Sequence, residues 1–369
     1  MALPLQNLYN NMEQKTFKVG IIGATGMVGQ RFILQLQNHP WFQIALLCAS
    51  PKNAGKRYAD VMQNRWAMKS PIPQSVQAML LHSTEDIATI KTHVDFVFCA
   101  VDMPKKEIIA LEEALAKAEI PVVSNNSANR MQSDVPMLIP ECNASHCEVI
   151  PSQKKRLGTE KGFIAVKPNC SIQSYVPAIV PLLAFEPALL HVCTYQAISG
   201  AGKTFETWPE MLDNVIPYIG GEDEKSEIEP QKVLGKVKNG KIELSQDLTI
   251  SAQCIRVPVS DGHLAAVSVK FRKKPSREQI LDAWQNYTST AQHLPSAPKP
   301  FLQYFEEENR PQTKLDRMQQ NGMGISLGRL REDPIWDYKF VCLSHNTLRG
   351  AAGGAILMAE LLVQEGYIK

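Results

Sequence analysis

The chain has 369 residues, of which 44% are hydrophobic and 21% are charged, and this composition predicts about two globular domains rather than a disordered chain. Lys and Arg number 39 and Asp and Glu 37, a net charge of +2, which excludes the strongly basic surface of a nucleic-acid or anionic-membrane binder. No apolar stretch approaches the roughly 20 residues of a membrane-spanning helix, so we expect neither nucleic acid nor membrane as a partner.

The N-terminus and the cysteines indicate the compartment. Residues 1–16 form a polar extension without the basic start and apolar block of a secretory signal. The 8 cysteines include no C-x-x-C pair and are too sparse for a disulfide scaffold. We therefore expect a reducing, cytoplasmic setting, and we identify no metal site.

The first half of the chain alternates short apolar runs with helix-like segments. Strands are predicted at 17–22, 42–48, 94–99 and 120–123, because these runs are rich in β-branched and other apolar residues. Helices are predicted at 27–38 and 104–118, the first from its helical spacing of apolar residues. This alternation predicts a parallel, doubly wound sheet of the Rossmann type.

The pattern changes after about residue 165. Longer, more regularly alternating strands are predicted at 188–197, 249–259, 264–272 and 338–343, which favours a mainly antiparallel sheet with helices on one face. A short helix is expected within 218–247, a connecting loop at 294–312 and a final helix at 346–366. The fold class is therefore α/β, with a dinucleotide-binding domain at 1–168 and 346–369. An α+β catalytic and dimerisation domain occupies 169–345.

A glycine-rich turn follows the first predicted strand and opens the first predicted helix. Its spacing is G-x-x-G-x-x-G, from Gly23 through Gly26 to Gly29, and it includes Thr25, Met27 and Val28. Glycines let the backbone approach a pyrophosphate, and the helix N-terminus supplies amide donors. The position at a strand-to-helix junction favours dinucleotide binding, although a tight structural turn also uses glycine.

The loop after the second strand favours NADP over NAD. An NAD site usually places Asp or Glu here to bind the ribose 2′-hydroxyl, whereas this chain has Ser50, Lys52 and Asn53, followed by Lys56. A hydroxyl and two lysines suit a 2′-phosphate. An ordinary polar surface loop is the alternative interpretation.

Cys170 is the candidate nucleophile. It follows the apolar run 163–166 and precedes an apolar helix-like stretch that begins at Ser171. A thiol at a helix start is expected to have a lowered pKa, and nearby amides suit an oxyanion formed beside the sulfur. The prolines at 177 and 181 make that helix irregular, so a buried structural thiol stays an alternative.

A nucleophilic thiol needs a proton partner, and His263 is the candidate. It follows a predicted strand and an Asp261-Gly262 turn, which places it at the rim of a sheet. Arg256 lies seven residues earlier, and its guanidinium suits a carboxylate of the substrate. A solvated hairpin with an incidental His and Arg is the alternative.

Together these segments resemble the aspartate-β-semialdehyde dehydrogenases of archaea, fungi and some bacteria, nearly end to end. The matching segments are 23–29, Pro168-Asn169-Cys170-Ser171, 194–202, Arg256-Val257-Pro258-Val259 with Gly262-His263, and 345–354. Two departures are Ile172, where many relatives have Thr, and Asn53, where Ser is common.

The resemblance implies NADPH-dependent reduction of L-aspartyl 4-phosphate to L-aspartate 4-semialdehyde with release of phosphate, a step toward lysine through diaminopimelate, threonine and methionine. It further implies a homodimer or homotetramer assembled through the second sheet. It assigns Cys170 as the nucleophile of a thioacyl intermediate, His263 as the acid and base, and Gln196 as the residue that orients the intermediate.

The resemblance also assigns the binding residues. Arg256 and Glu229 would hold the substrate's α-carboxylate and α-ammonium, and Arg130 and Lys232 its phosphate. Ser199, Gly200 and Asn346 would lie near the dinucleotide.

Three other functions stay open on the sequence alone. Reduction of malonyl-CoA or another activated acyl group on the same scaffold is the nearest, because carboxylate recognition by Arg256 also suits malonate. N-acetylglutamyl-phosphate reduction fits less well, since the cysteine context is Asn-Cys-Ser. A non-catalytic dinucleotide-binding regulator is disfavoured by the presence of thiol, histidine, glutamine and basic clusters together.

Overall fold

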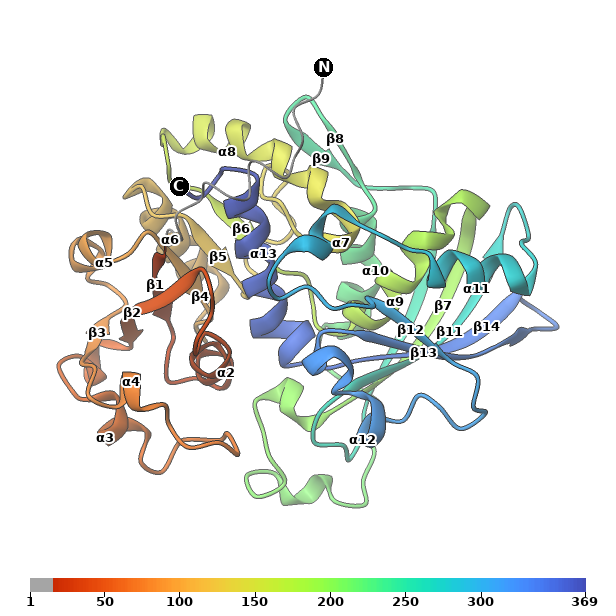
Figure 1. The fold of residues 1–369 in the computed structure, drawn as a ribbon, viewed down its shortest axis with the longest axis horizontal. Coiled ribbons are helices and arrows are strands. Elements are labelled where there is room, and N and C mark those ends of the chain that lie inside the picture. The colour runs from red at the N-terminus through yellow and green to blue at the C-terminus, as the bar shows by residue number, and fades with distance from the viewer. Residues whose placement is uncertain (1–15) are drawn as a thin grey trace.

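The computed structural model describes residues 16–369, so nearly all of the N-terminal extension expected at 1–16 lies outside the described residues. The described chain builds two six-stranded sheets and a two-stranded hairpin. Figure 1 shows the sheet of the N-terminal half and the sheet of the second half lying side by side, with the final helix α13 (Gly353–Gln364) between them.

The first sheet has the strand order β3-β2-β1-β4-β5-β6, and all of its pairings are parallel. Its strands are Phe17–Ile22 (β1), Phe42–Ala49 (β2), Leu81–Ser83 (β3), Phe96–Cys99 (β4), Val122–Ser124 (β5) and Ile164–Val166 (β6). The order changes direction next to β1, because β2 and β3 are added on one side of this strand and β4, β5 and β6 on its other side. Parallel sheets with such a switch point bind ligands at the carboxyl ends of their strands, so this edge is the expected cofactor site.

Helices cover both faces of the first sheet, as buried parallel strands require. Those of the N-terminal part are Met27–Gln35 (α2), Tyr58–Met62 (α3), Gln74–Gln77 (α4), Ile87–His93 (α5), Lys105–Lys117 (α6), Pro140–Asn143 (α7) and Ile150–Leu157 (α8). The C-terminal α13 contacts β5, α2 and α7. The last segment of the chain therefore packs on the N-terminal sheet.

The second sheet has the order β10-β7-β11-β14-β13-β12. Its strands are Pro187–Gln196 (β7), Thr249–Arg256 (β10), His263–Phe271 (β11), Leu302–Phe305 (β12), Ile325–Glu332 (β13) and Tyr338–Ser344 (β14). The three central pairings are antiparallel and the two outer pairings are parallel. The sheet is thus mixed, and β12 lies inside the stretch predicted as a connecting loop, so that prediction is wrong there.

One face of the second sheet carries helices. These are Ile172–Ile179 (α9), Glu222–Val233 (α10) and Arg277–Gln285 (α11), with the short α12 (Thr313–Asp316) beyond. The hairpin of Lys236–Lys238 (β8) and Lys241–Glu243 (β9) follows α10. Strand β7 alternates accordingly, since Leu190 and Val192 are buried toward α9, whereas Leu189 and Tyr195 are 40% and 37% exposed.

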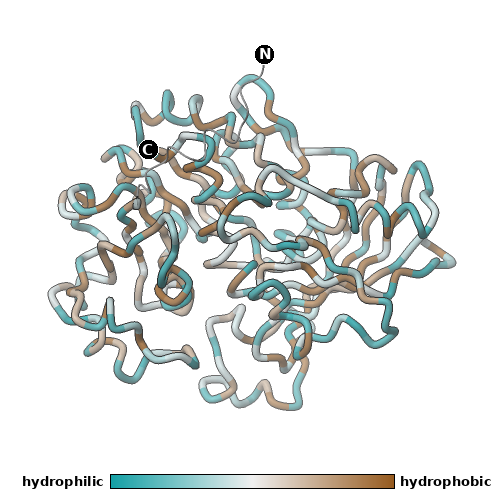
Figure 2. Tube along the Cα trace, viewed as in Figure 1, coloured by the Kyte–Doolittle hydropathy of each residue, from teal (hydrophilic) through white to brown (hydrophobic). Residues whose placement is uncertain are grey.

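The two sheets share a continuous hydrophobic core. One cluster joins Val97 of β4 to Val267 of β11 through Tyr175 and Ile179 of α9. Figure 2 shows hydrophobic segments along the strands and α13 and hydrophilic segments on the peripheral loops. A shared core fixes the relative position of residues from both sheets, which matters because the candidate site draws on both. No helix among residues 16–369 is long and apolar enough to cross a membrane.

Candidate active site

The glycine-rich turn connects β1 to α2 as predicted. Gly23 has φ +93°, and a Cβ there would lie 2.3 Å from the Ala100 carbonyl oxygen, while a Cβ on Gly29 would lie 2.3 Å from the Gly23 oxygen. Both positions therefore require glycine. Gly26 is the N-cap of α2 and has no side chain to cap the first amides, so the helix N-terminus is open to an anion.

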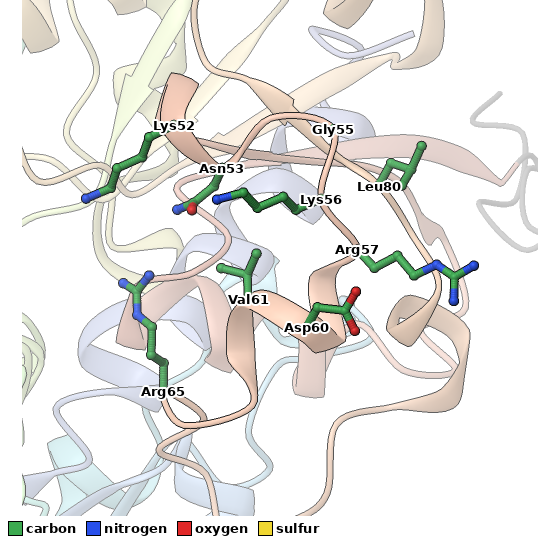
Figure 3. A pocket seen from close by; sticks show the side chains of 9 residues that line it. All are labelled: Lys52, Asn53, Gly55, Lys56, Arg57, Asp60, Val61, Arg65 and Leu80. Carbon is green, nitrogen blue, oxygen red and sulfur yellow. The ribbon is translucent and has the colours of Figure 1, made fainter.

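A basic pocket of about 740 Å³ lies beyond the end of β2. Its lining residues are Lys52, Asn53, Gly55, Lys56, Arg57, Asp60, Val61, Arg65 and Leu80. Figure 3 shows the side-chain ends of Lys52, Lys56 and Arg65 gathered around Asn53, whereas Arg57 points away. The sequence pointed to Lys52 and Lys56 but missed Arg65, which follows α3 and approaches the loop only in the folded chain.

The candidate nucleophile and the candidate acid–base residue lie in contact with each other. Cys170 lies between β6 and α9, His263 begins β11, and Cys170 Sγ is 3.4 Å from His263 Nε2. The Ala197 amide donates to His263 Nδ1 at 3.1 Å, so the neutral ring carries its hydrogen on Nε2, directed at the sulfur. Burial, followed by the charge of Arg256, lowers the pKa of His263 to about 3, which keeps the ring neutral.

The expected low pKa of the Cys170 thiol is wrong for this structure. Burial and then the negative charge of Glu222 raise the pKa of Cys170 to about 11, against the opposing effects of Lys167, Arg130 and Arg256. Helix α9 begins only after its N-cap Ser171. The favourable helix N-terminus is therefore outweighed by desolvation, which disfavours a charged sulfur.

Gln196 and Arg256 end two neighbouring parallel strands, β7 and β10, and are paired in register. Gln196 Nε2 donates to Thr194 Oγ1 at 3.2 Å and to Glu222 Oε2 at 3.4 Å. Arg256 Nη1 donates to the Ala197 carbonyl at 2.6 Å. Both side chains are nearly fully buried, so the register of the sheet fixes them next to each other, and Arg256 is near enough to the thiol to lower its pKa.

Glycines bring the backbone close to these groups. A Cβ on Gly200 would lie 3.0 Å from Arg256 Nη1 and 3.1 Å from His263 Nε2, and a Cβ on Gly350 would lie 2.8 Å from the Cys170 Cβ. The 200 and 350 segments thus pack directly on the site. Side chains at these positions would displace the groups that carry the chemistry.

The predicted substrate-binding residues form a second cluster. Arg130 Nη1 lies 2.9 Å from Glu229 Oε1, and the backbone N–H of Asn169 donates to Glu229 Oε2 at 2.6 Å. Arg130 Nε is buried and has no hydrogen-bond partner among the described residues, which leaves it available to an anion. Glu229 thereby joins the Arg130 loop to the residue before Cys170.

Lys232 is almost fully buried beneath the same loop. Its amine donates to the carbonyl oxygens of Arg130, of Gln132 at 2.6 Å and of Val135 at 2.8 Å. Burial lowers the pKa of Lys232 to about 7, against the raising effects of Asp134 and Glu229. The three hydrogens of the ammonium group are therefore directed at the backbone of the loop.

Ser199 and Asn346 lie next to each other and beside the turn that carries His263. Asn346 Nδ2 donates to Ser199 Oγ at 2.8 Å, and the Gly262 amide donates to Asn346 Oδ1 at 2.8 Å. These contacts join the end of β14 to the start of β11 and to the segment after β7.

Glu222, the first residue of α10, is a site residue that the sequence reasoning missed. It is 8% exposed and contacts both Asn169 and Gln196. Along the sequence it belongs to an acidic run with Asp223 and Glu224, and nothing local distinguishes it from them.

Known proteins match both halves of the chain. Residues 18–150 match the model of the semialdehyde dehydrogenase NAD binding domain, and residues 179–349 match that of the semialdehyde dehydrogenase dimerisation domain. The aspartate-semialdehyde dehydrogenase of Cryptococcus neoformans is 41% identical over 365 residues, 95% of this chain and 98% of that protein. That of Archaeoglobus fulgidus is 40% identical over 352 residues, 95% of this chain and 99% of that protein.

A solved structure shows the same similarity in three dimensions. The crystal structure of aspartate semialdehyde dehydrogenase with NADP from Candida albicans has a TM-score of 0.86 and 36% identity, and the match covers 96% of this chain and 100% of that chain. The similarity therefore extends over both sheets and is not restricted to the dinucleotide-binding half.

Proposed function

This chain belongs to the aspartate-semialdehyde dehydrogenase family and has that family's enzymatic activity in the biosynthesis of aspartate-derived amino acids, and on this premise we propose how its own residues perform the reaction. The substrate in the biosynthetic direction is L-aspartyl 4-phosphate, the products are L-aspartate 4-semialdehyde and phosphate, and Cys170 carries a thioacyl intermediate. The observation that supports this most directly is the 3.4 Å contact between Cys170 Sγ and His263 Nε2.

NADP is the proposed cofactor. The uncapped N-terminus of α2 and the glycines of the turn suit a pyrophosphate, and Gly23, Thr25, Gly26, Met27 and Val28 would line it. Lys52, Lys56 and Arg65 give the 2′-phosphate a cationic pocket, beside Ser50. Asp60 is the one acidic residue that lines this pocket, and in Figure 3 it lies with Arg57 on the side away from Asn53. When bound, NADPH supplies the hydride that reduces the thioacyl group.

The attack on the acyl phosphate breaks the carbon–oxygen bond to phosphate and forms the carbon–sulfur bond. Phosphate leaves as a stable anion, so it needs a cationic site more than a proton. Arg130, with its unpartnered buried Nε, is the direct ligand that we assign. Lys232 holds the carbonyl groups of the Arg130 loop, so we propose that it serves the phosphate site through the position of this loop and not as a direct ligand.

His263 presents an N–H to the sulfur. That hydrogen bond stabilises the thiolate that attacks the acyl carbon, and again the thiolate that leaves when the thiohemiacetal collapses to the aldehyde. To accept a proton at Nε2, the ring must first carry its hydrogen on Nδ1, against the Ala197 amide. We therefore propose that the acid and base role of His263 requires a small movement of the ring away from Ala197.

Arg256 and Glu229 are the proposed ligands of the substrate's α-carboxylate and α-ammonium, and Gln196 the residue that orients the intermediate. Arg256 and His263 both lie against Gly200, so the guanidinium lies near the imidazole that contacts the sulfur, where it suits a carboxylate. Glu229 reaches Asn169 beside the thiol. Ser199, Gly200 and Asn346, near His263, are the proposed neighbours of the nicotinamide half of the cofactor.

The dimerisation-domain match indicates a homo-oligomer, and we propose that a homodimer or homotetramer forms through the open face of the second sheet. Leu189 and Tyr195 expose apolar surface on that face of β7, where a second copy would bury it. The division of the chain into 1–168 with 346–369 and 169–345, and a cytoplasmic location for a protein whose eight cysteines are all free, belong to the same proposal.

The direct test is phosphate-dependent reduction of NADP by the purified protein with aspartate semialdehyde, repeated with NAD and with malonyl-CoA plus NADPH. We expect activity that needs phosphate and prefers NADP. Activity with malonyl-CoA alone would overturn the proposed substrate, and equal rates with NAD would overturn the proposed role of the basic pocket.

A further inference from the structure

The loop that carries Arg130 contacts a buried carboxylate that the proposed mechanism does not use. Glu112 belongs to α6, which packs on β5 and β6, and it is 0% exposed. Its carboxylate accepts hydrogen bonds from Ser124 Oγ at 2.5 Å, from Asn126 Nδ2 at 2.9 Å and from Asn129 Nδ2 at 2.7 Å. These donors extend from the end of β5 to the residue before Arg130.

Hydrogen bonds, mainly from this one loop, offset the burial of Glu112. Burial raises the pKa of Glu112, and the opposing effects are hydrogen bonds, of which the largest come from Ser124 and Asn129. The Ser124 hydroxyl accepts the backbone N–H of Asn126 at 3.0 Å, so its own hydrogen is left for the carboxylate. Another conformation of the loop would leave the buried carboxylate without these donors, which is costly.

We propose that Glu112 is a positioning residue of the reaction, whose carboxylate holds the 124–130 loop in the conformation that presents Arg130 to the phosphate group of the substrate. This rests on the proposed function, because it takes Arg130 as the phosphate ligand. Glu112 acts only through the loop, since its carboxylate is enclosed by the side chains that donate to it.

The loop carries two buried donors that suit an anion. Asn125 Nδ2 and Arg130 Nε have no hydrogen-bond partner within residues 16–369. Arg130 Nη2 donates to the Asn125 carbonyl at 3.1 Å, so the two residues lie together. Their neighbours in the chain, Asn126 and Asn129, both donate to Glu112. The carboxylate therefore fixes the spacing of two donors that could bind one phosphate oxygen group together.

Lys232 holds the other side of Arg130. Its ammonium group binds carbonyl oxygens from Arg130 to Val135, whereas the Glu112 carboxylate binds side chains that precede Arg130 in the chain. Arg130 thus lies between two buried anchors of opposite charge. Loss of the Glu112 anchor should displace Arg130 without unfolding the segment that Lys232 holds.

The direction of the hydrogen bond from Asn129 gives a sharp test. In Glu112→Gln, one carboxylate oxygen becomes an NH₂ group, which opposes the donors of the loop, and one of them must turn away. In Glu112→Gln with Asn129→Asp, that NH₂ group meets a carboxylate instead. The hydrogen bond returns with donor and acceptor exchanged, while the amide oxygen at position 112 still accepts from Ser124 and Asn126.

Initial rates are measured with aspartate semialdehyde, phosphate and NADP, and each is varied in turn. For Glu112→Gln we expect the KM for phosphate to rise roughly 10-fold, because a displaced arginine binds it less well, while the KM for NADP stays unchanged. The double variant with Asn129→Asp should recover much of the phosphate KM. Glu113→Gln is the matched control, because the adjacent Glu113 pairs with Arg156 at 3.2 Å on the surface, and it should match the unchanged protein throughout.

An unchanged phosphate KM in Glu112→Gln, an equal rise of the KM values for phosphate and NADP, or a folded double variant no better than the single one would overturn the proposal. If Glu112→Gln does not fold, as circular dichroism would show, Asn129→Ala decides, because it removes only the donor next to Arg130. It should raise the phosphate KM in the same way, and an unchanged value would count against positioning. An unchanged phosphate KM in Arg130→Ala would instead refute the proposed function, so the two failures can be told apart.

Discussion

Cys170 Sγ and His263 Nε2 lie 3.4 Å apart although 93 residues separate them in the chain. The thiol comes from the loop between β6 and α9, and the imidazole from the start of β11 in the second sheet. The shared core between the two sheets holds this distance, and the Ala197 amide holds the ring. Neither residue can carry the chemistry alone, so each should be separately indispensable.

Replacement of the thiol tests the nucleophile. Cys170→Ala removes the only atom that can form the thioacyl bond, and we expect turnover to fall by at least about 10³-fold. NADP affinity, measured by fluorescence titration, should change little. Cys193→Ala serves as the control and should retain activity. It removes a half-buried thiol on the face of β7 opposite to the buried Val192 and Thr194. Substantial turnover in Cys170→Ala would contradict the assignment.

Replacement of the imidazole tests the proton carrier. His263→Asn removes the N–H directed at the sulfur while keeping a polar side chain of similar reach, and turnover should fall roughly 10²- to 10⁴-fold. The dissociation constant of NADP should change far less, because the proposed contacts to the pyrophosphate and the 2′-phosphate lie at the Gly23–Gly29 turn and in the basic pocket. A variant that loses cofactor affinity but keeps kcat would remove His263 from the acid and base role.

The raised pKa of Cys170 predicts how the thiol reacts before substrate binds. A thiol whose pKa is about 11 is almost wholly protonated at neutral pH, and only the thiolate is alkylated. The rate of iodoacetamide labelling at Cys170, followed by peptide mass spectrometry, should therefore still rise steeply between about pH 8 and pH 10. A plateau below about pH 8 would show instead a thiol of lowered pKa, and a plateau reached near about pH 9.5 a thiol of ordinary pKa.

The sequence predicted those parts of the site that depend on local geometry. The turn from Gly23 to Gly29 could be placed because a strand precedes it and a helix follows. The thiol pKa could not, since burial and the charge of Glu222 arise only when α10 packs against the 169 loop. Arg65 and Glu222 carry no local signal, because each is brought beside its partners only by the fold of the chain.

The strands of the fold likewise divide into those that the local sequence predicts and those that it does not. The 8-residue β13 was missed, but β1, β2, β7, β10, β11 and β14 were predicted from their apolar or alternating runs. Strand β12 was not, because it lies in a proline-rich stretch and gains its pairing from β13. Its parallel partner lies about 20 residues away in the sequence, so no hairpin signal exists there.

Cofactor selectivity can be tested at the basic pocket. Lys52→Ala removes one of the cations gathered around Asn53 and should raise the KM for NADPH about 10-fold while leaving that for NADH unchanged. The NADPH effect should weaken at high salt, as expected for a screened charge. Arg57→Ala, a cation of the same pocket that points away, is the matched control. Equal effects on NADPH and NADH would contradict a 2′-phosphate site.

Stability depends on a buried ion pair behind the site. Arg349 follows β14 and meets Glu141 of α7 through two hydrogen bonds, at 2.5 Å and 2.6 Å, and both side chains are 2% exposed or less. Arg349→Met leaves the Glu141 carboxylate buried without its partner and should lower the free energy of unfolding by about 3–5 kcal/mol. Urea denaturation followed by circular dichroism measures this.

The matched comparison separates loss of a partner from loss of a charge. In Arg349→Met with Glu141→Leu, no buried charge is left unpaired, so much of the lost stability should return. Lys238→Ala breaks the surface pair with Glu243, in which both side chains are more than half exposed, and should leave the urea midpoint in place. If the double variant were as unstable as Arg349→Met alone, the cost would arise from lost packing over Phe301, whose ring lies 4.9 Å from the guanidinium, and not from the uncompensated carboxylate.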